Sequence, residues 1–309
     1  MAEAAYTLVD VFTHKPFGGN PLAVFMGASA LEGDIMQTLA KELNLSESVF
    51  VLPPLQETSD YRLRIFTPAR EMPMAGHPTV GAAFALVQAG LLGPENPTRN
   101  TPYTYHFDEG VGVIPVEVLY GINQDDLMIT MEQPLPSFAD PIAARADMAA
   151  LLSLDADDIH PDLPVQVVST GVPFTFIPLR SLDAVKRAVL RHDIWSALLK
   201  DTDAPDVFLF TPQAEDDAHS VHSRMFAPSL GIPEDPATGA ASGPLGCYLV
   251  RHGVVSTGPQ VQIISEQGYE MGRPSLIHIT ITSQGDEISR VRVGGHCVLM
   301  GEGRFYLPE

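Results

Sequence analysis

Basic residues are scarce in this sequence. Among 309 residues there are 18 Lys and Arg against 38 Asp and Glu, which gives a formal net charge of −20. A field of this sign repels nucleic-acid phosphates and anionic lipid headgroups. Neither a nucleic-acid partner nor a membrane partner is therefore expected.

Cysteine is also nearly absent, with only Cys247 and Cys297 in the chain. Two cysteines do not make a disulfide scaffold, and the sequence has no C-x-x-C pair or Cys/His cluster with the spacing of a zinc site. We expect two reduced thiols in a cytosolic protein, with a single disulfide as the alternative. No metal is expected.

Long apolar runs are missing as well. The longest candidate, residues 80–93, is shorter than the ~18 residues that a membrane span needs, and it contains Gln88. The N-terminal segment lacks a basic region, and Glu3 and Asp10 interrupt it, so no signal peptide is expected. The 45% of hydrophobic residues suffices for a large buried core. We expect a cytoplasmic globular protein of two domains.

Hydrophobic periodicity predicts secondary structure along the whole chain. Apolar residues four apart predict an amphipathic helix over 31–43, which Asn44 ends. A second helix is expected from Pro78, and Gly243-Pro244 is expected to kink or delay a later one. The pattern predicts another helix over 183–199 and strands over 6–12, 21–25, 45–52, 61–66, 111–119, 127–132, 165–178 and 206–211, with short strands from residue 260.

An internal repeat links two distant parts of the chain. Each copy reads R-x-F-x-P, then a loop, then [H/D]-P-x-x-G-A-A, first at 64–68 and 77–83 and again at 224–228 and 235–241. The copies are 160 residues apart before the loop (64 to 224) and 158 after it (77 to 235). Two linked motifs in one order and at nearly one spacing indicate two related halves.

Each half is expected to contribute a strand, a loop and a helix that begins at the His-Pro or Asp-Pro pair. Pro78 and Pro236 suit the first helical turn, and Asp235 is a candidate N-cap. Helix N-termini carry unpaired N–H groups and partial positive charge. If both face one cleft, they would bind a carboxylate or a phosphate, with His77 and Asp235 on opposite walls.

Three side chains are candidates for proton chemistry. Glu47 shares one face of its expected strand with apolar residues, so it lies either at an exposed strand end or in an apolar pocket suited to a general base. His77 is either a loop residue at a helix start or a catalytic group, and its repeat partner favours catalysis. That partner, Asp235, has a plain N-cap as its alternative role.

Two further patterns give weak or negative signals. His219 and His222 would suggest a metal, but residues three apart on a strand point to opposite faces. The sequence has neither G-x-G-x-x-G nor G-K-[ST], so dinucleotide and P-loop nucleotide sites are not expected.

Five blocks of the chain resemble the phenazine-biosynthesis isomerase family, the PhzF-like proteins. They run from near the N-terminus to about residue 275, in the family's order and spacing: VDVFTHKPFGGNPLAVF (9–25), NLSESVF (44–50), RIFTPAREMPMAGHPTVG (64–81), RMFAPSLGIPEDPATGA (224–240) and QGYEMGRPS (267–275). The resemblance is specific to the family and does not single out one substrate.

The resemblance implies an α+β fold of the diaminopimelate-epimerase type. Two pseudo-symmetric lobes, 1–125 with 298–309 and 126–297, would each wrap a curved, mostly antiparallel sheet around a central helix, with the active site between them. Family members are usually homodimers and use no cofactor. The site residues it implies are catalytic Glu47, His77 and Asp235, and substrate-binding Asn20, Ser46, Gly76, Gly239 and Ala240.

One position departs from the family pattern. The family commonly has Ser after EDPATG, where this chain has Ala240. The change removes a hydroxyl that is expected near the substrate carboxylate. Ser242 does not replace it, because helical geometry points that side chain elsewhere.

The resemblance leads to three hypotheses of function. The first is a cofactor-independent isomerase that moves a proton and a double bond in a small cyclic or unsaturated carboxylate, as in dihydro-hydroxyanthranilate isomerisation, with Glu47 as general acid and base. The second is a Glu/His-type epimerase of a small carboxylate. The third is an inactive carboxylate-binding protein. Two-thiol racemisation is excluded, because neither cysteine stands at a helix start.

Overall fold

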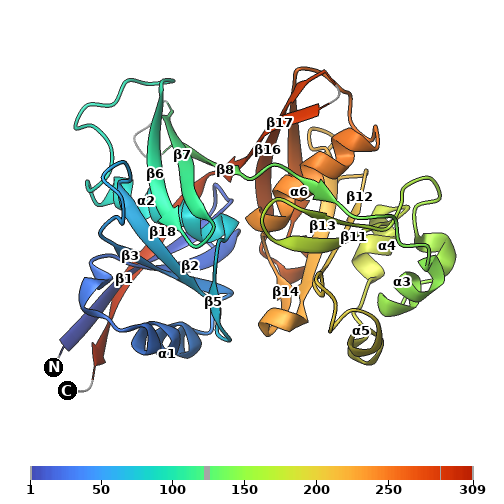
Figure 1. Ribbon diagram of the computed structural model, residues 1–309, viewed down its shortest axis with the longest axis horizontal. Helices are drawn as coiled ribbons and strands as arrows, with labels where there is room; N and C mark the ends of the chain where they lie inside the picture. Colours follow the sequence, from blue (N-terminus) through green and yellow to red (C-terminus); the bar gives the residue numbers. More distant parts are fainter. Residues whose placement is uncertain (1, 122–125, 286, 308–309) are drawn as a thin grey trace. The chain divides into compact units, whose positions relative to one another are not determined.

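The computed structural model describes residues 2–121, 126–285 and 287–307. The fold is mixed α/β, with extensive β-sheet and six α-helices in this described part (Figure 1). The chain divides into two compact units: unit 1 is Met1–Glu132 with Gly294–Glu309, and unit 2 is Gln133–Val293. Residue 125, at the boundary expected from the sequence, lies outside the described residues, and the assignment of pseudo-symmetric lobes stays a prediction.

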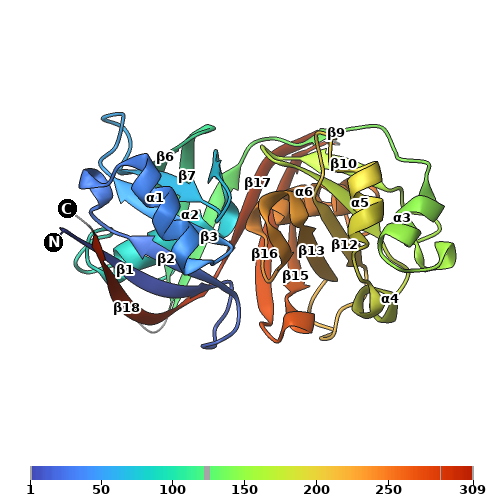
Figure 2. The ribbon, with the colours of Figure 1, turned by 90° about the horizontal axis from the view of Figure 1, so that it is seen from below.

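Unit 1 is built on a mixed sheet. Strand β1 pairs antiparallel with β2 and with β18, so the first and last described strands lie side by side (Figure 2). The β2–β3 and β4–β6 pairings are parallel. The elements are β1 (Ala2–Val11), β2 (Asn20–Phe25), α1 (Gly33–Leu43), β3 (Glu47–Leu52), β4 (Tyr61–Phe66), β5 (Glu71–Met72), α2 (Gly76–Gln88), β6 (Pro102–Glu109), β7 (Gly112–Tyr120), β8 (Leu127–Gln133) and β18 (Cys297–Leu307), with a 3-10 turn at Ala28–Ala30.

Unit 2 also combines parallel and antiparallel strand pairings, and its described residues form four α-helices. Its elements are β9 (Ser137–Phe138), α3 (Arg145–Leu151), β10 (Gln166–Ser169), β11 (Pro173–Pro178), α4 (Leu182–Arg187), α5 (His192–Leu198), β12 (Val207–Thr211), β13 (Val221–Ala227), β14 (Ile232–Asp235), α6 (Gly239–Arg251), β15 (Gln260–Gln267), β16 (Ser275–Gln284) and β17 (Glu287–Gly295). Its 3-10 turns are Ala156–Asp158, Pro228–Leu230 and Tyr269–Met271.

The two units show the same succession of strand pairings. A parallel pair, β2–β3 or β11–β12, is followed by an antiparallel one, β3–β4 or β12–β13. A short strand, β5 or β14, then pairs antiparallel with β4 or β13. A second parallel pair follows, β4–β6 or β13–β15. In each unit a 13-residue helix precedes that last strand, α2 before β6 and α6 before β15.

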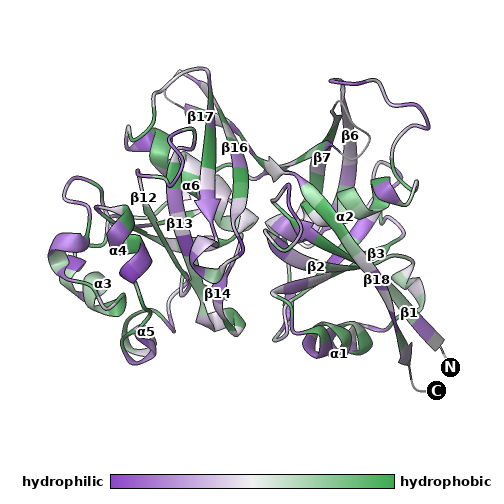
Figure 3. Cartoon of the chain, turned by 180° about the vertical axis from the view of Figure 1, so that it is seen from behind, coloured by the Kyte–Doolittle hydropathy of each residue, from purple (hydrophilic) through white to green (hydrophobic). Residues whose placement is uncertain are grey.

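Helices α2 and α6 are buried along most of their length, whereas α1 is amphipathic. Figure 3 shows α1 with mixed colours and α2 as mainly hydrophobic. Small residues allow the close packing. A Cβ atom on Gly81 of α2 would lie 2.4 Å from Leu22 of β2, and one on Gly246 of α6 would lie 2.5 Å from Ile279 of β16. Glycine at these positions therefore lets each helix touch its sheet.

The helix from Pro78 was predicted two residues late, since α2 begins at Gly76. The prediction that Asp235 caps α6 is wrong. Asp235 is the last residue of β14, where it pairs with Met225, and the N-cap is Thr238. The helix start is not delayed by Gly243-Pro244, since α6 runs from Gly239 to Arg251 with Pro244 inside it.

Two other elements differ from the sequence prediction. The single helix expected over 183–199 is two, because α4 ends at Arg187. The Arg224 guanidinium donates hydrogen bonds to the carbonyls of Val185 and Ala188, which stabilises this end. The strands after residue 260 are long rather than short, with 8 to 11 residues each. Within the described residues no helix is both long and apolar enough to cross a membrane.

Candidate functional site

A Glu–His–Asn contact lies in unit 1. Glu47 opens β3, His77 is the second residue of α2, and Asn20 opens β2. Glu47 Oε2 lies 2.9 Å from His77 Nδ1, and Asn20 Nδ2 lies 3.2 Å from the same nitrogen. The His77 side chain is 2% exposed and that of Glu47 12%. Three sequence-predicted site residues therefore meet in one buried contact.

His77 Nδ1 lies within hydrogen-bonding distance of both Glu47 and Asn20 but can pair with only one of them at a time. A protonated Nδ1 donates to a Glu47 carboxylate, and an unprotonated Nδ1 accepts from the Asn20 amide, but one nitrogen cannot do both at once. The other ring nitrogen, Nε2, is buried and has no hydrogen-bond partner among the described residues. The arrangement couples a carboxylate to an imidazole whose second nitrogen is left for another ligand.

Glu109, at the end of β6, forms a second polar contact at the start of α2. Its Oε1 lies 2.5 Å from Thr79 Oγ1, which also lies 2.7 Å from the Ala75 carbonyl oxygen. The Thr79 hydroxyl has one hydrogen, so both contacts are hydrogen bonds only when the Glu109 carboxyl carries the second hydrogen. Burial, with repulsion from Glu47 added, raises the pKa of Glu109 to about 8 despite the Thr79 bond. Glu109 is therefore neutral at pH 7.

Close backbone packing holds Glu109 beside this helix. The Val111 N–H donates to the Pro73 carbonyl at 3.2 Å, which joins the loop after β6 to the loop before α2. A Cβ atom on Gly110 would lie 2.8 Å from Pro73 Cα, so only glycine allows this approach. Glu109 Oε2 is buried without a hydrogen-bond partner in the described structure, which is tolerable only for an uncharged carboxyl.

In unit 2, the segment before α6 is held by Gln267. Asp235 is 6% exposed, and its Oδ2 accepts a hydrogen bond from Thr238 Oγ1. Gln267 Nε2 donates to the Asp235 carbonyl at 2.8 Å, and Gln267 Oε1 accepts from the Thr238 N–H at 3.0 Å. Gly268 has φ +78°, and a Cβ atom there would lie 2.5 Å from the Pro236 carbonyl oxygen. The segment from Asp235 to the helix start is thus fixed on both sides.

The first turn of α6 carries the remaining predicted residues. The Ala241 and Ser242 N–H groups both donate to the Thr238 carbonyl. The N–H groups of Gly239 and Ala240 precede these bonds, so no helical carbonyl is in place to accept from them. Ser242 Oγ donates back to the Thr238 carbonyl at 2.8 Å, so it does not replace the hydroxyl missing at Ala240.

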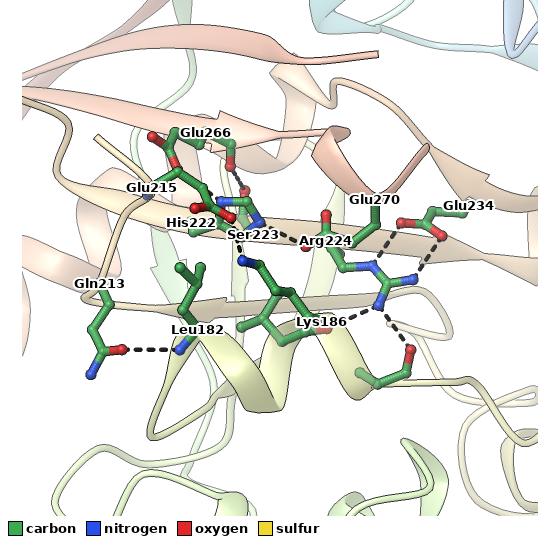
Figure 4. A network of polar contacts seen from close by, with 12 residues as sticks. Leu182, Lys186, Gln213, Glu215, His222, Ser223, Arg224, Glu234, Glu266 and Glu270 are labelled. Atoms are coloured by element: carbon green, nitrogen blue, oxygen red, sulfur yellow. Dashed lines mark hydrogen bonds and ion pairs between the residues drawn. The ribbon is translucent and has the colours of Figure 1, made fainter. Parts of the chain in front are cut away.

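A buried His–Glu cluster stabilises the strand that carries Gln267 (Figure 4). Glu266 Oε2 lies 2.8 Å from His222 Nδ1, and its Oε1 lies 2.7 Å from His219 Nδ1. His222 Nε2 contacts Glu270 at 2.9 Å. The expectation that the two histidines point to opposite faces is wrong, because His219 precedes β13 and turns toward the same carboxylate.

The cluster is charged at neutral pH. Burial lowers the pKa of His222, but its hydrogen bonds to Glu266 and Glu270 outweigh burial and raise the pKa to about 9. Burial likewise raises the pKa of Glu266. The hydrogen bonds from His222, His219 and two backbone N–H groups overcome this and lower it to about 2. An imidazolium and a carboxylate therefore lie fully buried side by side.

The two cysteines take no part in these contacts. Cys247 is the ninth residue of α6 and Cys297 opens β18, and both are free and buried. Burial raises the pKa of the Cys247 thiol to about 12 and that of the Cys297 thiol as well. Neither is a nucleophile near neutral pH.

The structure places the predicted residues in two groups. Asn20, Glu47 and His77 meet in unit 1, with Ser46 in the bend before β3 and Gly76 as the first residue of α2. Asp235, Gly239 and Ala240 lie in unit 2 around the start of α6. Sequence analysis missed Glu109, since the strand over 102–109 was not predicted. The one available signal was the Glu-Gly pair at 109–110.

Comparison with known proteins identifies the family of this chain. The model of the family described as phenazine biosynthesis-like protein matches residues 9–303. A trans-2,3-dihydro-3-hydroxyanthranilate isomerase from Pseudomonas aeruginosa is 35% identical over 305 residues, covering 98% of this chain and 99% of the relative.

Solved structures resemble the whole chain. A PhzF-family phenazine biosynthesis protein from Bacillus anthracis has a TM-score of 0.88 at 27% identity, and a predicted epimerase from Pseudomonas aeruginosa has 0.82 at 31%. Each alignment covers 99% of this chain and 100% of the other. The relatives define the class of enzyme as an isomerase. The chain belongs to the phenazine biosynthesis-like family.

Proposed function

We propose that this protein is a cofactor-independent isomerase that moves a proton and a double bond within a small cyclic or unsaturated carboxylate. The observation that carries the proposal is the 2.9 Å contact between Glu47 and His77 at the start of a buried helix. A carboxylate that is mostly excluded from water and hydrogen-bonded to an imidazole is suited to general acid–base catalysis. The isomerase names of full-length relatives support the same reaction class.

In this mechanism Glu47 removes a proton from a carbon that the substrate's carboxylate or double bond activates. The same acid then returns the proton to another carbon. His77 and Asp235 orient the substrate and relay protons, and Asn20 and Ser46 contribute polar contacts. Backbone N–H groups of Gly76, Gly239 and Ala240 bind the substrate carboxylate, because the first turn of a helix leaves them unpaired and partly positive.

The repeated order of strand pairings supports a finer description of the fold. We infer an internal duplication that produced two pseudo-symmetric lobes, each a curved sheet around a central helix, α2 or α6. Both helices are buried among strands of their own unit, as this description requires. A homodimer in the cytoplasm is part of the same proposal and follows from the resemblance to the family.

Glu109 has a supporting role in the proposed mechanism. A neutral Glu109 adds no negative charge beside the Glu47 carboxyl group. Ionisation of Glu109 would place a negative charge there and would disfavour an anionic substrate. Glu109 is thus a positioning residue that acts through charge.

Replacing Glu109 with Gln should change the pH profile more than the rate at pH 7. Gln stays neutral and keeps a hydrogen-bonding group at Thr79, so we expect turnover at pH 7 within about threefold of wild type. Wild-type activity should fall above pH 8 as Glu109 ionises, and this fall should be absent from Glu109→Gln. Identical alkaline limbs in rate measurements from pH 6 to 10 would contradict the assigned role.

Hydrogen exchange with solvent tests the proposed function directly. Wild-type protein in deuterated water, incubated with trans-2,3-dihydro-3-hydroxyanthranilate and a panel of small unsaturated or hydroxylated carboxylates, should remove a carbon-bound proton signal from at least one compound. Deuterium at a new carbon with a moved double bond is the isomerase result. Deuterium at the original carbon with inverted configuration would instead indicate an epimerase, which the predicted-epimerase neighbour makes the second candidate.

Binding without exchange would contradict catalysis and indicate the carboxylate-binding alternative. Ala240 bears on the choice of substrate, because the side chain following EDPATG in this chain cannot donate a hydrogen bond. The panel therefore extends beyond the hydroxyanthranilate compound to other small carboxylates.

A further inference from the structure

Two imidazoles and a carboxylate gather in unit 1, outside the site described above. One possible ligand atom each from His14, Asp126 and His296 lies within 4.8 Å of the other two. His14 is exposed, whereas Asp126 and His296 are partly exposed, so an ion from solvent can reach all three. None of these residues takes part in the proposed catalytic mechanism.

The three residues come from segments that are distant in sequence. His14 follows β1, Asp126 precedes β8, and His296 lies between β17 and β18. The Thr13 N–H donates a hydrogen bond to the His296 carbonyl at 3.0 Å, which fixes the two histidine segments side by side. The imidazole rings lie with their centres 3.8 Å apart and their planes 30° apart. Asp126 Oδ1 lies 3.5 Å from His296 Nδ1.

The donor set selects a class of ion. Two imidazole nitrogens with one carboxylate oxygen suit divalent first-row transition metals such as Zn²⁺, Co²⁺ and Ni²⁺, whereas Mg²⁺ and Ca²⁺ prefer oxygen ligands alone. The net charge of −20 raises the local concentration of cations around the protein. A hollow of about 810 Å³ adjoins the three residues and is also lined by Phe84, Gln88 and Leu299. It leaves room for water or a small ligand at the remaining coordination positions.

The present spacing is close to that of a loaded site. Two imidazoles bound side by side to one ion, at a metal–nitrogen distance of ~2.1 Å, have ring centres roughly 4.5–5 Å apart. Binding therefore requires the two rings to separate by about 1 Å from their stacked positions. His14 can make this movement, because its side chain is exposed.

We propose that His14, Asp126 and His296 bind one divalent transition-metal ion at the surface of unit 1. The proposal is independent of the isomerase function, since it uses none of the residues of that site. It also uses none of the residues of the cluster formed by His219, His222 and Glu266.

Isothermal titration of the full chain, prepared without a histidine tag and stripped with a chelator, tests the proposal. We expect one Zn²⁺ or Ni²⁺ per chain, a micromolar or tighter dissociation constant, and no competition from millimolar Mg²⁺. The double variant His14→Ala/His296→Ala should bind at least about 100-fold more weakly, because two of three protein ligands are lost. Asp126→Asn should weaken binding to an intermediate extent.

His192→Ala is the matched control, because His192 is also exposed and lies next to an aspartate. It should leave the stoichiometry and the dissociation constant unchanged. With Co²⁺ as a spectroscopic probe, the wild-type protein should show ligand-field bands that the double variant lacks. Equal binding by wild type and double variant, or no binding by wild type at 1 mM ion, would overturn the proposal.

Discussion

Replacing Glu47 with Gln is expected to reduce proton exchange on the substrate by about 10³-fold or more, with little change in folding. A positioned acid or base contributes typically ~10²–10⁴-fold to rate, and here one carboxylate both removes and returns the proton. Gln has nearly the same shape and retains an oxygen that can accept from His77 Nδ1. The loss would therefore report on proton transfer rather than on packing.

The rates are measured by proton NMR in deuterated water on whichever carboxylate the wild type turns over. Glu42→Gln serves as the control, because Glu42 is exposed on α1 and the substitution makes the same chemical change nearby in sequence. Its rate should match wild type. A second variant, Glu47→Asp, keeps the charge but shortens the reach, so it should recover part of the activity. Full exchange by Glu47→Gln would rule out the proposed mechanism.

Replacing Glu266 with Gln should cost the largest amount of stability, about 3–5 kcal/mol in the free energy of unfolding. Breaking a buried ion pair by removing one partner leaves the other charge uncompensated, and His222 and Glu266 have fully buried side chains. The substitution also weakens the hydrogen bonds that Glu266 accepts from the Glu215 and Asp216 N–H groups. By contrast, Asp193→Asn should leave the free energy of unfolding nearly unchanged, because its pair with Arg191 is exposed.

The chain carries its own probe for this measurement. Its one tryptophan, Trp195, lies in unit 2 with the cluster and donates a hydrogen bond to the Pro205 carbonyl at 2.7 Å. Urea unfolding followed by its fluorescence therefore reports on the unit that contains Glu266. A loss below 1 kcal/mol in Glu266→Gln would show that the ion pair does not stabilise this unit.

The cluster of His222 and Glu266 also determines how the free energy of unfolding changes with pH. The folded pKa of His222, about 9, lies above its unfolded value of 6.5, so its contribution is complete below pH 6.5 and is lost as the pH rises through 9. The folded pKa of Glu266, about 2, lies below its unfolded value of 4.5, so its contribution is complete above pH 4.5 and is lost as the pH falls through 2. Between these limits both contributions are present.

Much of the local structure could be predicted from sequence, because periodicity and turn residues act over short distances. The strand at 61–66 was predicted with the bounds that the structure shows, and Asn44 ends α1 as predicted, in a left-handed conformation. The helix starts were less predictable. Asp235 has the side chain of an N-cap residue, but its backbone belongs to β14, where it pairs with Met225.

The polar partners could not be predicted, because each depends on residues far apart in sequence. Glu109 meets Thr79 across 30 residues, and His222 meets Glu266 across 44. A spacing rule within one strand says nothing about a carboxylate that a neighbouring strand supplies. The Glu47–His77 contact was expected to belong to one site because a family resemblance placed both residues there, and no local pattern joined them.

The pairing of β1 with β18 has a consequence for how the chain assembles during synthesis. Residues 2–11 pair with β2 along one edge, but their other antiparallel partner is residues 297–307, whereas every residue of unit 2 lies between 133 and 293. A ribosome that has reached residue 293 has therefore made all of unit 2 and has yet to make a strand that unit 1 needs. Unit 1, which holds Glu47 and His77, completes its strand pairing later than unit 2. Strand β18 is synthesised after unit 2, and closing so long a loop is slow. In a nascent chain, unit 2 can therefore fold before unit 1 has its full set of strands.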